Sequence, residues 1–255
     1  SIDRERRAPR RGGAHTMKPG RKAAPLKILV VDVGGSHVKL LASGQSLPRE
    51  FVSGPRMTPQ QMVQGVLELA ADWPFDGVTI GSPGVVRHGV PVREPHNLGD
   101  GWVGFDFRTA FGREVRMIND AAMQALGSYQ GGKMLFLGLG TGLGSALIVD
   151  HLIVPMELGH LHCGQGRTYE DLLGTQGFER LGSKKWQLKV YAVVRGFSDA
   201  LLPDEIVIGG GRAPLLEHLP PLTRRGANED AFLGGFRLWD EPVPPAAGPT
   251  TKEPA

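Results

Sequence analysis

The chain has 255 residues, of which 40% are hydrophobic and 22% charged, as in an ordinary folded protein of one large domain or two small lobes. Its single cysteine, Cys163, excludes a disulfide framework and a cysteine zinc cluster within one chain, and it fits a reducing compartment. No run approaches the roughly 20 apolar residues that cross a bilayer, and the arginine-rich start leads into no apolar signal core. We therefore expect a cytoplasmic protein without a membrane partner.

The positive charge is concentrated at the N-terminus. Residues 1–27 hold nine Lys or Arg and two acidic residues, whereas the rest of the chain holds 20 basic and 24 acidic residues. We interpret residues 1–25 as a disordered basic leader. An anionic partner of this segment, such as nucleic acid or polyphosphate, is the alternative, but the acidic balance of the remaining chain gives no reason to expect nucleic-acid binding.

Apolar patterning predicts mixed α/β structure along the chain. In the first half it predicts strands at 26–33, 38–41 and 77–81 and a helix at 58–72, followed by a turn-rich segment at 82–104. In the second half it predicts strands at 115–118, 134–139, 145–149 and 205–208 and helices at 121–129 and 185–202. We expect an N-terminal lobe at 26–118, a C-terminal lobe at 119–240 and a loose Pro-rich tail at 241–255.

Glycine-rich turns follow four of the predicted strands, at 34–36, 81–84, 138–144 and 209–211. Glycine lets backbone N–H groups approach an anion closely, although a single such turn more often only closes a hairpin. The pattern of strand, glycine turn and strand occurs twice, at 28–41 and 134–149, which indicates two related lobes with a phosphate-binding hairpin in each. The chain has neither a P-loop nor a dinucleotide-binding fingerprint.

Two polar groups stand out beside these turns. Asn119 and Asp120 lie between a buried strand and a helix start, where they can form an N-cap or present a carboxylate that takes a proton from an attacking hydroxyl. Glu157, His160 and Glu170 offer directional hydrogen bonds to the hydroxyls of a polyol such as a pyranose, although surface ion pairing is the simpler interpretation. His160, His162 and Cys163 are a poor set of zinc ligands because a fourth ligand is missing.

Together these motifs resemble the ROK family of sugar kinases, over about residues 28–211. The matching segments are Asp32-Val-Gly-Gly-Ser36 with Lys39, Ser82-Pro-Gly-Val-Val86, Asn97-Leu98, Asn119-Asp120-Ala121, Gly140-Thr-Gly-Leu-Gly144, Glu157-Leu-Gly-His160 and Ile208-Gly-Gly-Gly211. The chain is similar in particular to the compact bacterial branch that contains polyphosphate glucokinases. The resemblance implies an α/β, actin-like (ribonuclease H-like) fold of two lobes with the sugar in the cleft between them.

The resemblance also implies roles for individual residues. Asp120 would be the catalytic base, and the sugar would be bound by Asn97, Asn119, Asp120, Glu157, His160 and Glu170. The donor phosphates would be bound by Asp32, Gly34, Gly35, Ser36, Lys39, Thr141, Gly142, Gly144, Gly209, Gly210 and Gly211. Mg²⁺ would lie near Asp32, the phosphoryl donor would be ATP or inorganic polyphosphate, and the protein would be a homodimer.

The chain departs from the family pattern in two places. Most ROK kinases carry a cysteine cluster after the histidine that binds structural zinc, but here only Cys163 is present, so we expect no zinc site and a weaker match at Glu170. The segment after Gly211 is short, which leaves the nucleoside pocket, and thereby the choice of donor, open.

We therefore expect a hexose kinase that converts glucose to glucose 6-phosphate. A kinase for mannose or an N-acetylhexosamine is the alternative within enzymes, since selectivity at the sugar 2-position depends on pocket shape. A catalytically silent sugar-binding protein is the alternative outside them. A sugar-responsive repressor is disfavoured because residues 1–26 are too short and too rich in Arg, Gly and Pro to fold as a DNA-binding domain.

Overall fold

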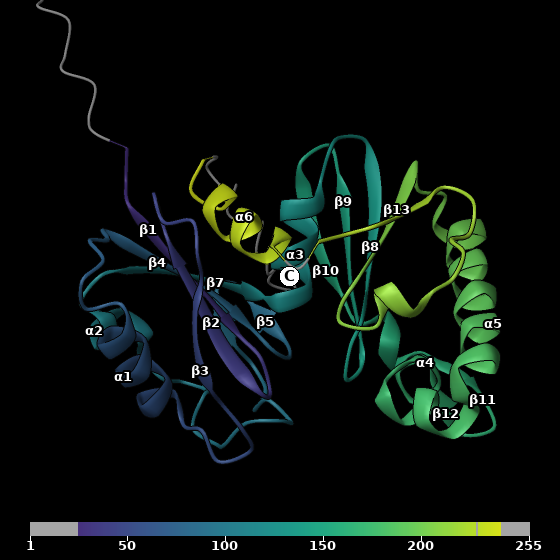
Figure 1. Ribbon diagram of the computed structural model, residues 1–255, viewed down its shortest axis with the longest axis horizontal. Helices are drawn as coiled ribbons and strands as arrows, with labels where there is room; N and C mark the ends of the chain where they lie inside the picture. Colours follow the sequence, from purple (N-terminus) through teal and green to yellow (C-terminus); the bar gives the residue numbers. More distant parts are fainter. Residues whose placement is uncertain (1–24, 228, 241–255) are drawn as a thin grey trace, which may run out of the picture.

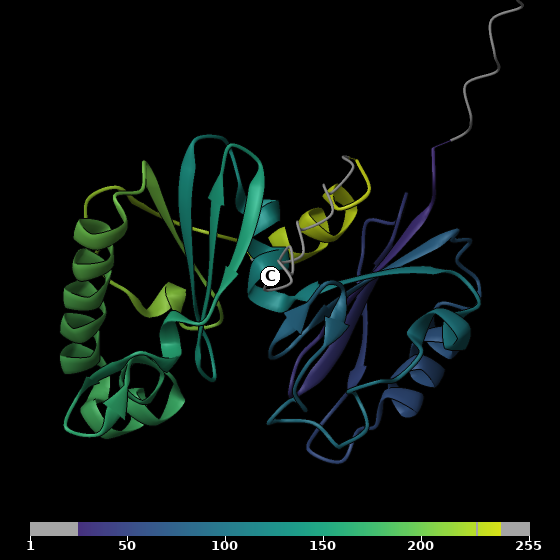
Figure 2. The same cartoon turned by 180° about the vertical axis from the view of Figure 1, so that it is seen from behind.

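The structure, a computed structural model, describes residues 25–227 and 229–240. Two α/β lobes lie side by side, and helices α3 (Asp120–Ser128) and α6 (Asp230–Arg237) lie between them (Figures 1 and 2). The predicted tail and, apart from Pro25, the predicted leader lie outside the described residues. Within the described part of the chain, no helix is long and apolar enough to span a membrane.

The N-terminal lobe is built on a five-stranded sheet in the order β3-β2-β1-β4-β7. β1 and β2 form an antiparallel hairpin, and β1, β4 and β7 run parallel. Helices α1 and α2 lie on the outer face of this sheet (Figure 1). The bounds are β1 Ile28–Val33, β2 His37–Ala42, β3 Arg49–Val52, α1 Pro59–Leu69, β4 Gly77–Ser82, β5 Val86–Arg87, β6 Val90–Pro91, α2 Phe107–Phe111 and β7 Glu114–Asn119.

The second lobe repeats this topology. Its sheet has the order β10-β9-β8-β13-β14, with an antiparallel β8–β9 hairpin and parallel β8, β13 and β14. The repeat predicted from the two glycine hairpins is therefore confirmed. The bounds are β8 Lys133–Leu139, β9 Leu143–Val149, β10 Leu152–Met156, η1 Leu158–His160, β11 His162–Gly164, β12 Arg167–Thr168, α4 Tyr169–Leu173, α5 Thr175–Leu201, β13 Glu205–Gly209, η2 Ala213–Leu215 and β14 Thr223–Arg225.

The long helix α5 corrects one sequence prediction. It begins at Thr175, whereas the apolar pattern predicted a start at residue 185. Gly182 interrupts the helix with a φ of 70°, a left-handed conformation that glycine adopts without a steric penalty. The helical period is therefore continuous only after this residue, which is why the first two turns were not recognised.

Strand alternation decides which side chains face the space between the lobes. In β1, Leu29 and Val31 belong to the apolar cluster under α1 and α2, whereas Ile28 and Val30 belong to the cluster that contains α3 and α6. By the two-residue period, Asp32 projects on the same face as Ile28 and Val30. The carboxyl end of β1 therefore presents an acid toward the other lobe.

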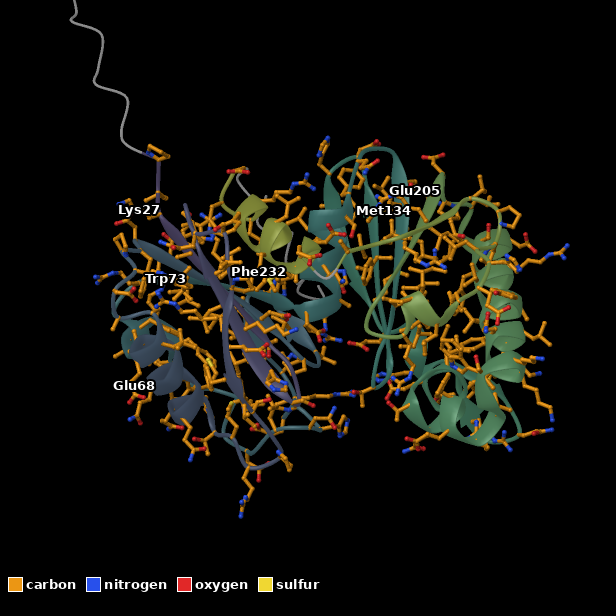
Figure 3. The ribbon with its side chains drawn as sticks, viewed as in Figure 1. Lys27, Glu68, Trp73, Met134, Glu205 and Phe232 are labelled. Atoms are coloured by element: carbon orange, nitrogen blue, oxygen red, sulfur yellow. The ribbon has the colours of Figure 1, made fainter. Side chains whose placement is uncertain are left out.

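The same alternation organises β8 in the second lobe. Met134 and Phe136 pack with α3 and α6, and Leu135 and Leu137 pack with α5. Figure 3 shows Met134 in the second lobe and Phe232 on α6, between the two lobes. Because α6 packs back on the N-terminal lobe, the chain crosses between the lobes twice. The predicted domain boundaries at 118/119 and 240/241 stay a prediction.

Candidate active site

A cleft of about 990 Å³ lies between the lobes, at the carboxyl ends of β1, β4 and β7 and at the glycine turn between β8 and β9. Crevices at strand ends are the usual ligand sites of α/β proteins. Of the residues predicted from sequence, Ser36 and Gly209 are not among those that line the cleft. Those that line it are Asp32, Gly34, Gly35, Lys39, Asn97, Asn119, Asp120, Thr141, Gly142, Gly144, Glu157, His160, Glu170, Gly210 and Gly211.

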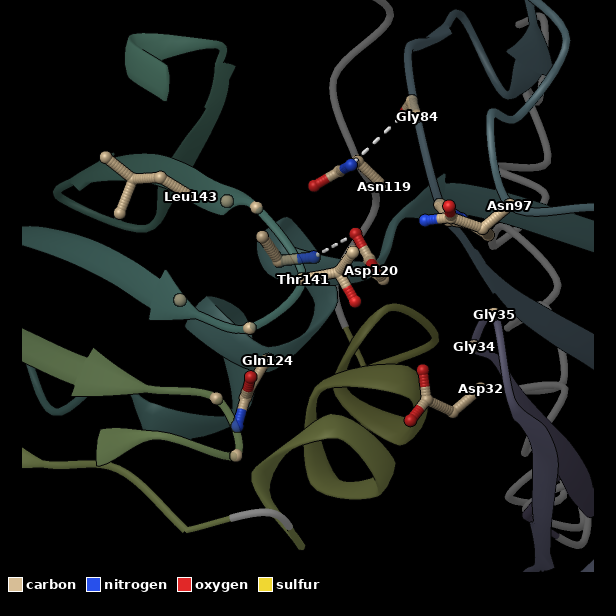
Figure 4. Close-up of a pocket in the computed structure, with 18 of the residues that line it drawn as sticks. Asp32, Gly34, Gly35, Gly84, Asn97, Asn119, Asp120, Gln124, Thr141 and Leu143 are labelled. Carbon is tan, nitrogen blue, oxygen red and sulfur yellow. Dashed lines mark hydrogen bonds between the residues drawn. The ribbon is translucent and has the colours of Figure 1, made fainter. Parts of the chain in front are cut away.

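Asn119 and Asp120 stand at the junction of β7 and α3. The side-chain oxygen of Asn119 accepts a hydrogen bond from the Ala122 N–H (3.1 Å), and its amide donates to the Gly84 carbonyl (2.9 Å; Figure 4). The N-cap predicted here is therefore confirmed for Asn119. Asp120 is the first residue of the helix, and its carboxylate accepts from the Ala121 N–H (2.8 Å). This arrangement fixes the Asp120 side chain toward the cleft.

Asp32, near the end of β1, and Asp120, at the start of α3, point into the same space (Figure 4). Burial raises the pKa of Asp120 to about 7, with further raising by the charge of Asp32, while the Ala121 N–H opposes the shift. Burial also raises the pKa of Asp32 to about 6, against the lowering effect of Lys39. A carboxyl group whose pKa lies near neutrality is well matched to accept a proton from a substrate.

The first glycine turn, at residues 34–36, connects β1 and β2. The Gly34 N–H donates to the His37 carbonyl (3.0 Å), and the Ser53 hydroxyl donates to the Gly34 carbonyl (2.6 Å). Lys39 lies opposite Asp32 in the antiparallel register. A Cβ atom on Gly35 would lie 2.9 Å from the Cβ of Asn97, so this position has no room for a larger residue. The turn therefore packs directly on a predicted sugar-binding residue.

The second glycine turn, at residues 140–142, connects β8 and β9. The Thr175 N–H, at the start of α5, donates to the Thr141 carbonyl (3.0 Å), and the Arg212 guanidinium donates to the Gly140 carbonyl (2.5 Å). A Cβ on Gly142 would lie 2.3 Å from the Glu170 carboxylate. Both hydrogen bonds use carbonyl groups of the turn, and residues 140–142 line the cleft.

The acidic residues predicted to bind sugar come from the second lobe. Glu157 lies directly before η1 and 3.8 Å from the His160 ring nitrogen. The buried Ser145 hydroxyl donates to the Met156 carbonyl (2.9 Å) and accepts from the Leu158 N–H (3.0 Å), and thereby positions Glu157 between them. Burial raises the pKa of Glu157; His160 lowers it, Glu170 raises it, and Arg93 lowers it.

Several polar residues that line the cleft were not predicted from sequence. Arg93, Glu94 and His96 come from the turn-rich segment at 82–104, in which only Ser82–Val86 and Asn97-Leu98 matched the family motifs. Glu50 comes from the edge strand β3 and lies opposite Lys39. Gln124 projects from α3 (Figure 4). These positions are set by contacts between distant segments, which a local pattern does not encode.

Asp32 suits a magnesium ion that is also bound by the substrate. Mg²⁺ in phosphoryl-transfer enzymes is commonly held by one or two carboxylates together with the phosphates of the substrate. The Asp32 carboxyl group, which faces the cleft from β1, is such a donor. Across residues 25–227 and 229–240, no three His, Cys, Asp or Glu side chains are grouped closely enough to hold a metal by themselves, and the expectation that zinc is absent stays a prediction.

Comparison with known proteins places the chain in a family. The model of the ROK family matches residues 28–185. The chain belongs to the ROK family. The polyphosphate glucokinase of Mycobacterium tuberculosis is 30% identical to this ROK protein over an alignment of 237 positions, which covers 82% of this chain and 89% of the relative.

Solved structures of other ROK proteins share the fold. An inorganic polyphosphate/ATP-glucomannokinase from Arthrobacter sp. strain KM matches with a TM-score of 0.71 and 24% identity, over 84% of this chain and 98% of that one. A ROK family glucokinase from Streptomyces griseus, solved with glucose and AMPPNP, matches with a TM-score of 0.70 and 16% identity, over 83% and 98%. The predicted actin-like, two-lobed α/β fold is confirmed.

Proposed function

We propose that this protein is a hexose kinase, with glucose as its first acceptor and glucose 6-phosphate as its product. The observation that carries this proposal is the position of Asp120, a carboxyl group with a pKa of about 7 that faces the cleft between two glycine turns. Phosphoryl transfer requires few groups from a protein: a base, a cradle for the phosphates and a divalent cation. The 30% identity to a polyphosphate glucokinase supports glucose as the acceptor.

In the proposed reaction, Asp120 accepts the proton of the sugar 6-hydroxyl. The oxygen of this hydroxyl then attacks the terminal phosphorus of the donor, and the bond from that phosphorus to the leaving phosphate oxygen breaks. The sugar hydroxyls are held by Asn97, Glu157, His160 and Glu170. Asn119 assists with the hydrogen-bonding positions of its side-chain amide that remain free after it caps α3. Because these residues come from both lobes, the sugar is bound only when both contribute.

The glycine turns bind the donor. The Gly34 and Gly140 N–H groups already donate within their own turns. The N–H groups of Gly35, Thr141 and Gly142 would therefore face the phosphates, and Lys39 would add a positive charge. Asp32 would hold Mg²⁺ together with the donor phosphates, and the ion, when bound, would offset their negative charge. By family resemblance, the turn at 209–211 would accept the nucleoside of ATP. The relatives' names support either ATP or polyphosphate as donor.

Two further expectations belong to this proposal. We propose that the enzyme acts in the cytoplasm, where glucose and phosphoryl donors are available, and that it forms a homodimer, as its family resemblance implies. The N-terminal basic leader has no role in the proposed reaction.

A coupled assay for glucose 6-phosphate tests the proposal. Purified protein, Mg²⁺ and glucose are combined with ATP in one series and with polyphosphate in another, and Asp120→Asn is the control for contaminating host kinases. Product in the wild type and none in the variant is the expected result, and the more active series identifies the donor. If neither donor gives product, mannose and N-acetylhexosamines are tried; silence with all of these sugars would favour a binding protein without activity and overturn the proposal.

A further inference from the structure

A loop between β6 and α2, residues 94–103, carries His96 and Asn97 into the cleft. Glu94 closes this loop through its own side chain. One carboxylate oxygen accepts from the Trp102 N–H (2.9 Å), and the other accepts from the Val103 N–H (3.2 Å). Both oxygens of one side chain are thus bound to successive backbone groups at the far end of the loop.

The other side of the loop is anchored in the N-terminal lobe. The Trp102 side chain is fully buried, and Leu98 is 5% exposed, in the apolar cluster under α1 and α2. The Gly99 N–H donates to the Met57 carbonyl (3.0 Å). The loop is therefore fixed by the core on one side, while on the cleft side its closure depends on the Glu94 carboxylate.

This closure determines where Asn97 lies. Asn97 sits between the two ends that Glu94 joins and packs against Gly35 so closely that a Cβ atom there would lie 2.9 Å from its own Cβ. A displacement of the loop therefore moves Asn97 relative to the first glycine turn. An amide that hydrogen-bonds one sugar hydroxyl loses the required distance and angle when it moves by about 1 Å.

We propose that Glu94 is a positioning residue for sugar binding: its carboxylate clamps the loop so that Asn97 is held at the sugar site before the sugar arrives. This inference rests on the proposed function. Glu94 does not touch the reacting atoms. Without the clamp, the loop has more conformations to lose when the sugar binds, and the cost of ordering it reduces sugar affinity. The phosphoryl-transfer step, which uses Asp120 and the glycine turns, is unaffected once the sugar is bound.

The test compares Glu94→Ala with a matched loss of an acid elsewhere in the same lobe. Asp106 also accepts two hydrogen bonds, from the N–H (3.0 Å) and hydroxyl (2.6 Å) of Thr109, but it caps α2 and is not among the residues that line the cleft. We expect Glu94→Ala to raise the KM for glucose about tenfold with kcat within about twofold of wild type. Asp106→Ala should leave the KM for glucose unchanged while lowering the Tm.

Glu94→Gln keeps one carbonyl oxygen as an acceptor, so we expect a KM for glucose between those of wild type and Glu94→Ala. If Glu94→Ala does not fold, this variant carries the test. Calorimetric glucose binding is measured alongside turnover for each protein. An unchanged glucose affinity in folded Glu94 variants, or a fall in kcat without a change in KM, overturns the role of Glu94. No glucose binding and no turnover in the wild type instead overturns the proposed function, and this inference with it.

Discussion

Asp120 combines three properties that a general base needs. Its backbone is fixed by the first turn of α3, its carboxylate faces the cleft, and its pKa is raised to about 7 by burial and by the charge of Asp32. At neutral pH such a group is deprotonated in a large fraction of molecules and is basic enough to accept a proton. Because of these properties, a rise in pH should increase the reaction rate and decrease the stability of the folded protein.

The rate should fall in acid. Below pH 7 Asp120 holds a proton and cannot accept another, so kcat/KM for glucose should decrease about tenfold per pH unit on an ascending limb with an apparent pKa of about 7. The measurement is the initial rate at low glucose between about pH 5.5 and pH 8.5, with the coupling enzymes shown not to limit the rate. A flat profile over this range would remove Asp120 from the base role.

Stability should change in the other direction. The pKa of Asp120 in the folded protein lies above its ordinary value of 3.8, so its contribution to stability is fully present below that value and is lost as pH rises through about 7. Asp120→Asn, which is neutral at every pH, should therefore raise the Tm at pH 8 by about 5 °C, or roughly 2 kcal/mol, and leave it unchanged near pH 4. Asp199→Asn, on the exposed side of α5, is the control. An equal Tm of Asp120→Asn and wild type at pH 8 would show that the carboxylate is not penalised by burial.

The contact between the first glycine turn and Asn97, in the loop at 94–103, gives a second test at the residue scale. Gly35→Ala places a methyl group 2.9 Å from the Cβ of Asn97 and should displace it, raising the KM for glucose about tenfold. Gly196→Ala, on α5 with no atom within 4 Å of the added Cβ, should leave KM unchanged. Equal KM values for the two variants would mean that Asn97 does not bind the sugar.

Sequence reasoning could identify residues whose role is local. Asn119 was predicted as an N-cap because a strand ends and a helix begins there, and the structure confirms this. Asp120 could be singled out for the same reason. The roles of Ser145 and Glu94 could not be predicted. Ser145 holds the segment around Glu157, and Glu94 closes a loop; both bond to backbone groups eight or more residues away in the sequence. Nothing in the sequence between each of these side chains and its backbone partners indicates the contact.

At the scale of elements, α3 and α6 form the junction between the lobes. They cross at glycines: a Cβ on Gly234 would lie 1.8 Å from the Met123 carbonyl oxygen, and one on Gly127 would lie 1.8 Å from the Asp230 carbonyl oxygen. Beyond α6, the Trp239 ring nitrogen donates to the Thr79 hydroxyl (2.7 Å), which donates to the Gly235 carbonyl (2.8 Å). This junction fixes the helix that begins with Asp120 to the sheet whose strand β1 carries Asp32.

A methyl group at the crossing should therefore damage the whole junction. Because the clash of Gly234→Ala is with the backbone, no side-chain rotation relieves it, and we expect a loss of about 2–3 kcal/mol, seen as a Tm lowered by roughly 5 °C or more. Gly196→Ala, also helical but in open space, should keep or slightly raise the Tm. A Tm for Gly234→Ala equal to that of wild type would mean that the two helices do not cross so closely.

The elements themselves were predictable to different degrees. The buried strands β1, β4, β8 and β13 were predicted within two residues of their observed bounds because a continuous apolar run is a strong local signal. Edge strands such as β3 and β10 were missed, since only one side of each is paired and none of their residues is buried. α6 was missed because its glycines lower helix propensity, and the crossing with α3 requires them.

At the scale of the whole molecule, two lobes of the same topology present a glycine turn to one cleft. The N-terminal lobe supplies Asp32, Lys39 and Asn97, and the second lobe supplies Glu157 and Glu170. The duplicated hairpins could be predicted from sequence, but the register that brings them together could not, because it depends on the junction of α3 and α6. Closure of the lobes on a sugar would exclude water from the reaction.

The most direct test of the account separates chemistry from binding in Asp120→Asn. Glucose affinity is measured by calorimetry, and glucose 6-phosphate formation is measured in a single turnover with the donor that the wild type prefers. A base that acts mainly in the transition state predicts a rate lowered by about 10²–10⁴-fold and a glucose affinity within about threefold of wild type. A turnover rate like that of the wild type would contradict the central claim that Asp120 is the base of this kinase.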